Sequence, residues 1–108
     1  MEVTEISSHA KKLVITENGQ EVARAFIYLI KNDLHEQPYA LLEDVFVQEK
    51  FRGQGLGIKI INAAIEEARK AGCYKIIGTS RYERENVHKF YQKMGFKDYG
   101  KEFRMNLN

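Results

Sequence analysis

The turn at residues 52–57 carries residue types that could bind a diphosphate. Its sequence, Arg52-Gly53-Gln54-Gly55-Leu56-Gly57, follows an apolar, strand-like run and opens directly into a helical pattern. Glycine lets the backbone approach a ligand closely and adopt positive φ without strain. The start of a helix offers unpaired N–H groups and a partial positive charge, which suit phosphate. Arg52 adds a forked cation beside them. A tight strand-to-helix turn is the simpler alternative, but one or two glycines would be enough for it.

Two common nucleotide-binding motifs do not fit this turn. A P-loop needs a Lys-Ser/Thr pair after its last glycine, and this chain has Ile58-Lys59-Ile60 there. The dinucleotide fingerprint, counted from Gly53, needs a glycine where Ile58 stands, and no acidic residue follows in a position to bind a ribose.

The pattern R-x-x-G-x-G does resemble the pyrophosphate loop of the GNAT superfamily of acetyl-CoA-dependent N-acetyltransferases. A second segment, residues 84–96, is similar to the late helix of that family, which ends in Tyr-x-x-x-Gly-Phe, as Tyr91-Gln92-Lys93-Met94-Gly95-Phe96 does here. The two motifs stand in the family order, with one helix and one strand between them. The resemblance runs from about Lys12 to the C-terminus.

The resemblance implies an α+β fold built on a central twisted mixed sheet. Its N-terminal strands form an antiparallel meander, a crossover helix joins two parallel central strands that splay apart around the cofactor, and a late helix precedes a C-terminal strand. Periodicity and turn signals predict the following elements: strands at 12–16, 21–30 and 39–47, a helix at 56–71, a strand at 74–79, a helix at 85–94, and a final strand or hairpin at 96–107. An Asn-Gly turn at 18–19 predicts a tight hairpin between the first two strands.

Length and composition set broad bounds on the class of protein. The 108 residues have room for one domain, residues 1–108, in which the N-terminal helices of the family are largely absent. A net charge of +2 is too small to indicate nucleic acid or a membrane as a partner. One cysteine, Cys73, rules out an internal disulfide and suits a reducing compartment. No apolar run reaches membrane-spanning length, and the acidic start lacks the apolar stretch of a signal peptide, so we expect a cytoplasmic protein.

The resemblance implies acetyl-CoA as the acyl donor. The backbone of the third strand would pair with the pantetheine amides as an added strand does, and the loop amides would bind the pyrophosphate. Many relatives carry an asparagine at the position of Arg84, so Arg84 could instead touch phosphate. The expected cofactor-binding residues are Val45, Phe46, Val47, Arg52, Gly53, Gln54, Gly55, Leu56, Gly57, Ile58, Arg84 and Asn86. No metal is expected, because one cysteine and isolated histidines cannot supply a ligand cluster.

Tyr91 is the candidate catalytic acid. When an amine attacks the thioester, the departing thiolate has a parent pKa of about 8.5, whereas a tyrosine hydroxyl, at about 10, stays protonated at neutral pH and can donate to the sulfur. In the family, a tyrosine at this place is commonly the general acid. The alternative is a packing role, because Tyr91 lies beside Phe90 on an apolar helix face.

Glu43 is the candidate base, acting directly or through water on an amine that is mostly protonated at neutral pH. In a regular strand, Glu43 and Asp44 would point to opposite faces, so only one could reach the acyl site. A solvated surface pair is the alternative.

The acceptor is expected to be a small-molecule amine or a protein or peptide amine. An open acceptor side would suit a peptide, a protein or a polyamine, and one closed in a homodimer would suit a small molecule. A noncatalytic acyl-CoA-binding module that regulates a partner is the rival function. A nucleic-acid-binding role is weaker, because no basic stripe carries interleaved aromatic residues.

Overall fold

The computed structural model describes all residues from Met1 to Asn108 as two compact units. We call residues 1–78 the sheet unit and residues 79–108 the α2 unit. Neither helix of the chain has the length and apolar character needed to cross a membrane.

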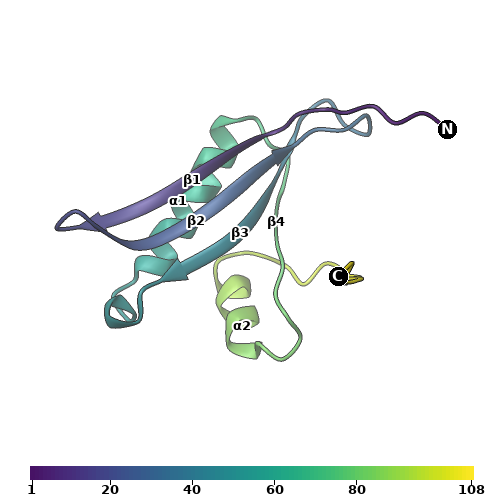
Figure 1. Ribbon diagram of the computed structural model, residues 1–108. Coiled ribbons are helices and arrows are strands. Elements are labelled where there is room, and N and C mark those ends of the chain that lie inside the picture. Colours follow the sequence, from purple (N-terminus) through teal and green to yellow (C-terminus); the bar gives the residue numbers. More distant parts are fainter. The chain divides into compact units, whose positions relative to one another are not determined.

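The sheet unit holds a four-stranded sheet in the order β1-β2-β3-β4 (Figure 1). Strands β1, β2 and β3 form an antiparallel meander, and β3 pairs with β4 in parallel. Its elements are β1 (His9–Glu17), β2 (Gln20–Ile30), β3 (Tyr39–Val47), the 3-10 helix η1 (Glu49–Phe51), α1 (Leu56–Lys70) and β4 (Ile76–Gly78). The predicted α+β class, the meander and the parallel pair joined through a helix are therefore confirmed.

The β1–β2 hairpin turns where the sequence predicts it. Asn18 and Gly19 both have positive φ, of 51° and 76°. Two successive positive φ values are typical of the type I′ turn, whose twist matches that of the flanking strands.

The core lies between one face of the sheet and α1, which runs along β1, β2 and β3 (Figure 1). Alternate residues of the strands meet one apolar stripe of the helix, as the two periodicities require. The fully or nearly fully buried side chains are Val22, Ala23, Ala25, Ile27, Ala40, Leu42, Ile60, Ile61, Ala64 and Ala68. Gly72 ends α1: it has φ 79°, and the Cys73 N–H donates to the Ala68 carbonyl at 3.0 Å.

The α2 unit contains the second predicted helix, α2 (Glu85–Lys93), none of whose residues is fully buried. Gly95, with φ 105°, ends this helix, and the Phe96 N–H donates to the Tyr91 carbonyl at 3.0 Å.

The predicted C-terminal strand at 96–107 is wrong, because the structure has no strand after α2. The apolar residues at alternate positions of this segment, Phe103, Met105 and Leu107, are 81–91% exposed. An alternating pattern becomes a strand only where another strand pairs with it, and the α2 unit contains no strand.

Candidate active site

Strand β3 contains a bulge in its second half. Arg24 and Phe26 of β2 pair with Phe46 and Glu43 of β3, so β3 has one residue more than β2 between these pairs. Asp44, inside the interruption, has a left-handed φ of 50°. An extra residue on one strand of a pair is what defines a β-bulge. The condition of a regular strand, under which Glu43 and Asp44 would point to opposite faces, is therefore not met.

The bulge changes which side chains face the core. Ahead of it Ala40 and Leu42 are buried, and after it Val45 and Val47 are the half-buried residues. Phe46 is left 38% exposed. A one-residue shift reverses the faces of a strand, and here it turns an aromatic ring outward.

One edge of β3 has no strand partner beyond the bulge. The ladder with β4 joins only Ala40–Leu42 to Ile76–Gly78. From Glu43 to Val47 the main-chain groups on that side are not paired to another strand. Such an edge can bind the amides of an extended ligand as an added strand would.

Hydrogen bonds attach the loop after β3 to β2 and to the end of β3 itself. The Gln48 N–H donates to the Val22 carbonyl at 2.9 Å, and the Gln48 side-chain amide donates to the Glu21 carbonyl. Arg52 Nε donates to the Val47 carbonyl at 2.9 Å. These bonds hold the loop at the end of β3 before any ligand binds.

The start of α1 has the features of an anion site. Gly53 and Gly55 have φ of 81° and 80°, and no atom lies within 4 Å of where a Cβ would stand on either. Gly55 is the N-cap, no side chain caps the helix, and its first turn has no acidic residue. Because Lys59 is the first residue whose N–H bonds back, to the Gly55 carbonyl at 3.1 Å, the N–H groups of residues 56–58 remain available. Of the three glycines, Gly57 lies inside the helix.

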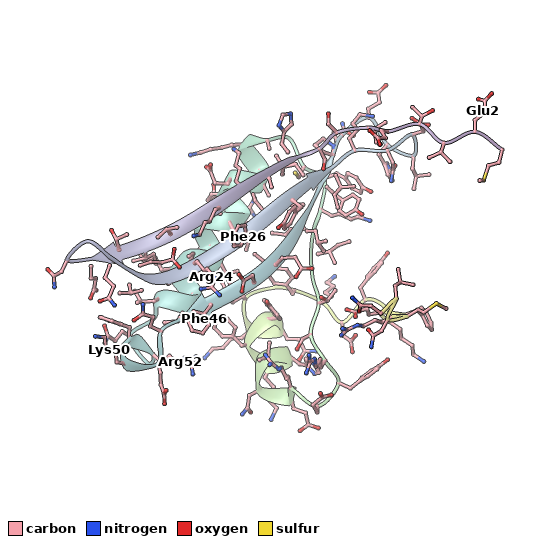
Figure 2. All side chains as sticks on the ribbon, viewed as in Figure 1. Glu2, Arg24, Phe26, Phe46, Lys50 and Arg52 are labelled. Atoms are coloured by element: carbon pink, nitrogen blue, oxygen red, sulfur yellow. The ribbon has the colours of Figure 1, made fainter.

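Two cationic side chains, those of Lys50 and Arg52, lie at this loop, whereas Arg24 lies on β2 and is bound by Asp44 (Figure 2). The guanidinium carbon of Arg52 lies 5.7 Å from the Phe46 ring centroid, and that of Arg24 lies 4.7 Å from the same centroid. Lys50 Nζ lies 5.3 Å from the centroid of Phe51. The loop thus combines main-chain donors with cations, which suits a polyphosphate.

Glu43 faces an open hollow of about 510 Å³ in the sheet unit. The carboxylate of Asp44 is occupied by Arg24, whose hydrogen bond holds the pKa of Asp44 below its usual range. Glu43 forms no ion pair or side-chain hydrogen bond, so of the two carboxylates it is the one available to an acceptor amine. The residues that line the hollow are Ser8, Tyr28, Ile30, Leu41, Glu43 and Asp44.

The other predicted site residues lie on α2. Arg84 and Asn86 are exposed at its start, and the Arg84 side chain does not cap the helix. The half-buried Tyr91 ring lies 6.2 Å from that of Phe90 and 5.2 Å from that of Phe96. The structure therefore brings Glu43, residues 45–47 and residues 52–58 together in the sheet unit, and places Arg84, Asn86 and Tyr91 in the α2 unit.

His88 has a structural contact. Its Nε2 lies 2.7 Å from the carbonyl oxygen of Arg81. Because a carbonyl only accepts, Nε2 carries the proton in this contact. The ring thereby joins α2 to the loop before it.

Sequence reasoning missed Arg24 and the bulge. The sequence does not reveal the shift of buried positions from 40 and 42 to 45 and 47, since Leu41 and Phe46 are apolar as well. Nothing in the sequence pointed to Arg24, because its partner Asp44 lies on another strand.

The family model described as the acetyltransferase (GNAT) family matches residues 2–96. A solved acetyltransferase of Trypanosoma brucei is 30% identical with a TM-score of 0.83, and the match covers 91% of this chain and 69% of that one. The chain belongs to the GNAT acetyltransferase family.

Two further relatives are glucosamine 6-phosphate N-acetyltransferases. The curated enzyme of Trypanosoma brucei brucei is 39% identical over 66 residues, which cover 61% of this chain and 43% of that protein. The solved structure of the Arabidopsis thaliana enzyme is 26% identical with a TM-score of 0.81, and the match covers 92% of this chain and 67% of that one. The match therefore spans less than half the length of the first relative.

Proposed function

We propose that this protein transfers an acetyl group from acetyl-CoA to a primary amine. One observation supports the proposal most: the unpaired edge of β3 leads directly into a loop that is already arranged for an anion. Coenzyme A needs these two features in this order, because its pantetheine arm carries amides and ends in a diphosphate. Membership of the acetyltransferase family agrees with it.

The proposed reaction is a direct attack by the amine nitrogen on the thioester carbonyl. Glu43 accepts the proton that the ammonium form must lose, directly or through water. The C–S bond breaks, and the sulfur leaves with the electron pair. Tyr91 donates its hydroxyl proton to that sulfur, so that coenzyme A departs as a thiol, and the second proton that the nitrogen loses as the amide forms restores the Tyr91 hydroxyl.

The first acceptor to test is glucosamine 6-phosphate, because two of the relatives described above are named for it. The carboxylate of Glu43 in the hollow suits a cationic amine in general. Peptide amines and polyamines are therefore the comparison acceptors, and a homodimer that closes the hollow would favour the sugar.

The test has two parts on the same protein. Calorimetry with coenzyme A measures binding at the loop, and free-thiol release from acetyl-CoA measures transfer to glucosamine 6-phosphate, glucosamine, spermidine and a lysine peptide. We expect binding and turnover with at least one amine. Absence of binding heat at millimolar coenzyme A would overturn the proposal. Binding without turnover for any amine would favour the noncatalytic acyl-CoA-binding module.

A further inference from the structure

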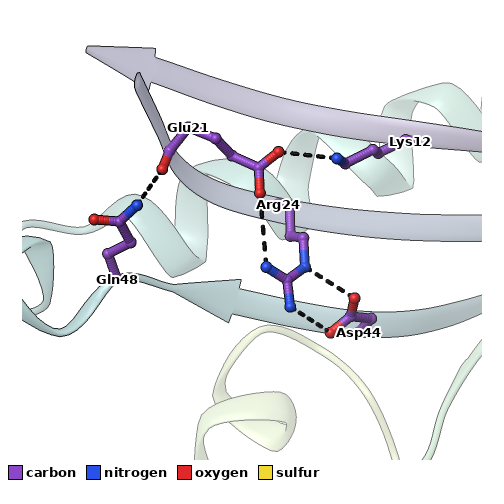
Figure 3. A network of polar contacts seen from close by, with 5 residues as sticks. All are labelled: Lys12, Glu21, Arg24, Asp44 and Gln48. Carbon is purple, nitrogen blue, oxygen red and sulfur yellow. Dashed lines mark hydrogen bonds and ion pairs between the residues drawn. The ribbon is translucent and has the colours of Figure 1, made fainter. Parts of the chain in front are cut away.

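The Arg24 side chain on β2 binds the bulge residue of β3, Asp44 (Figure 3). Its Nε donates to Asp44 Oδ2 at 2.9 Å and its Nη2 donates to Oδ1 at 3.1 Å. Two parallel bonds from a planar guanidinium fix the orientation of a carboxylate as well as its position. We call these two hydrogen bonds from Arg24 to Asp44 the fork. Asp44 is the bulge residue with φ 50°, so the fork holds the one strained backbone position of β3.

Arg24 touches both sides of the bulge. Its guanidinium carbon lies 4.7 Å from the ring centroid of Phe46, two residues beyond Asp44. Val45 therefore lies between two residues that the same side chain holds.

Arg24 is itself held by a second carboxylate. Glu21 Oε2 lies 3.6 Å from Arg24 Nη1, and Glu21 Oε1 lies 2.9 Å from Lys12 Nζ. These contacts run across β1, β2 and β3 (Figure 3). A guanidinium with two carboxylate partners has less freedom than an isolated surface pair.

From this geometry we infer that Arg24 is a positioning residue, which keeps the bulge in place and thereby sets the main-chain groups of Asp44 and Val45 that face the acyl end of acetyl-CoA. The inference rests on the proposed function. Without the fork, β3 can relax toward a regular register, which would move Phe46 inward and Val45 outward. The loop that binds the diphosphate is anchored separately, through Gln48 and Arg52, and does not depend on Arg24.

The inference predicts that binding and turnover respond differently to loss of Arg24. Arg24→Met should leave the affinity for coenzyme A within about threefold and lower kcat by about tenfold or more, because small misplacements of reacting atoms are costly. Arg24→Lys keeps the charge without the fork and should not restore kcat. Lys12→Met removes the outer ion pair of the same network and is the matched control, with kcat expected at the wild-type value.

Two measurements keep the inference separate from the proposed function. Amide resonances of residues 44–46 in the ligand-free protein should shift in Arg24→Met and stay in place in Lys12→Met. Arg24→Met/Asp44→Ala should lose no more kcat than the single variants, because both act through one fork.

Wild-type kcat in Arg24→Met, or an equal loss in Lys12→Met, would overturn the inference. Unshifted amides at residues 44–46 would overturn it even if the wild type shows no turnover. A wild type without turnover, together with shifted amides, would instead overturn the proposed function and leave Arg24 as the residue that fixes the bulge.

Discussion

The sheet unit and the α2 unit differ in how their structures are stabilised. Every fully buried apolar side chain lies between Val22 and Ala68, on the sheet or on α1. No residue of α2 is fully buried, and the apolar positions 87, 90 and 91 on the helix and 94 just after it are half-buried. Local opening costs least where few apolar contacts are buried. The loop and the edge of β3 thus belong to the well-packed unit, and the candidate acid belongs to the weakly packed one. We therefore expect that substitutions can separate cofactor binding from turnover.

The largest expected effect is on binding by the sheet unit. Gly55→Leu should weaken binding of coenzyme A by about 100-fold or more, equivalent to about 3 kcal/mol, because the new side chain would occupy the space of the diphosphate. Gly72→Leu is the matched control. Gly72 has φ 79° against 80° for Gly55, and a Cβ at either position meets no atom within 4 Å. Both variants carry the same backbone strain, of about 1–2 kcal/mol. Calorimetry should show lost binding in Gly55→Leu alone, and equal affinities would contradict the loop assignment.

The second largest expected effect is on kcat and comes from the candidate acid in the α2 unit. Tyr91→Phe should lower kcat by about 10²–10⁴-fold and leave the affinity for coenzyme A unchanged, because only the proton donor is removed. Tyr99→Phe is its control, since Tyr99 lies in the same unit and is 97% exposed. Steady-state kinetics with the best acceptor provide the measurement. A Tyr91→Phe enzyme with wild-type kcat would exclude Tyr91 as the acid.

A stability measurement sharpens the comparison directly. Ile61→Ala removes a side chain that is 1% exposed and should cost about 2–5 kcal/mol of unfolding free energy. Phe90→Ala, on the half-buried face of α2, should cost less despite its larger ring. Urea unfolding followed by circular dichroism measures both. A larger loss in Phe90→Ala would show that the α2 unit is packed as firmly as the sheet unit.

The smallest expected effect is on the pH dependence of stability. The carboxyls with lowered pKa, Glu21, Asp44 and Glu67, all lie in the sheet unit, and each is hydrogen-bonded to a lysine or an arginine. A pKa lowered by folding stabilises the protein above the unfolded value, about 4, and that stabilisation is lost as the pH falls through the folded value. Asp44→Asn removes one such contribution. Its melting temperature should be slightly below that of the wild type at pH 7 and approach it at pH 3. A difference that does not change with pH would argue against the Arg24–Asp44 pair.

The sequence predictions were accurate where the signal was local and failed where the structure depended on residues distant in the chain. The helix at 56–71 was predicted to within one residue of α1, and the strand at 39–47 coincides with β3, because hydrophobic period, turn residues and a stopping glycine are all local. The strand at 96–107 was wrong because an alternating pattern does not show whether another strand is available to pair with it.

The candidate site likewise has one part that depends on local sequence and another that depends on contacts between distant residues. The sequence alone determined the local structure of the candidate anion-binding loop, since three glycines, an arginine and a following helix are contiguous and their main-chain donors depend on local dihedral angles. Only the tertiary structure decided the bulge at Asp44, the fork from Arg24 and the unpaired edge of β3. These depend on the register between strands that are distant in the chain, and register is set by the packing of the whole sheet.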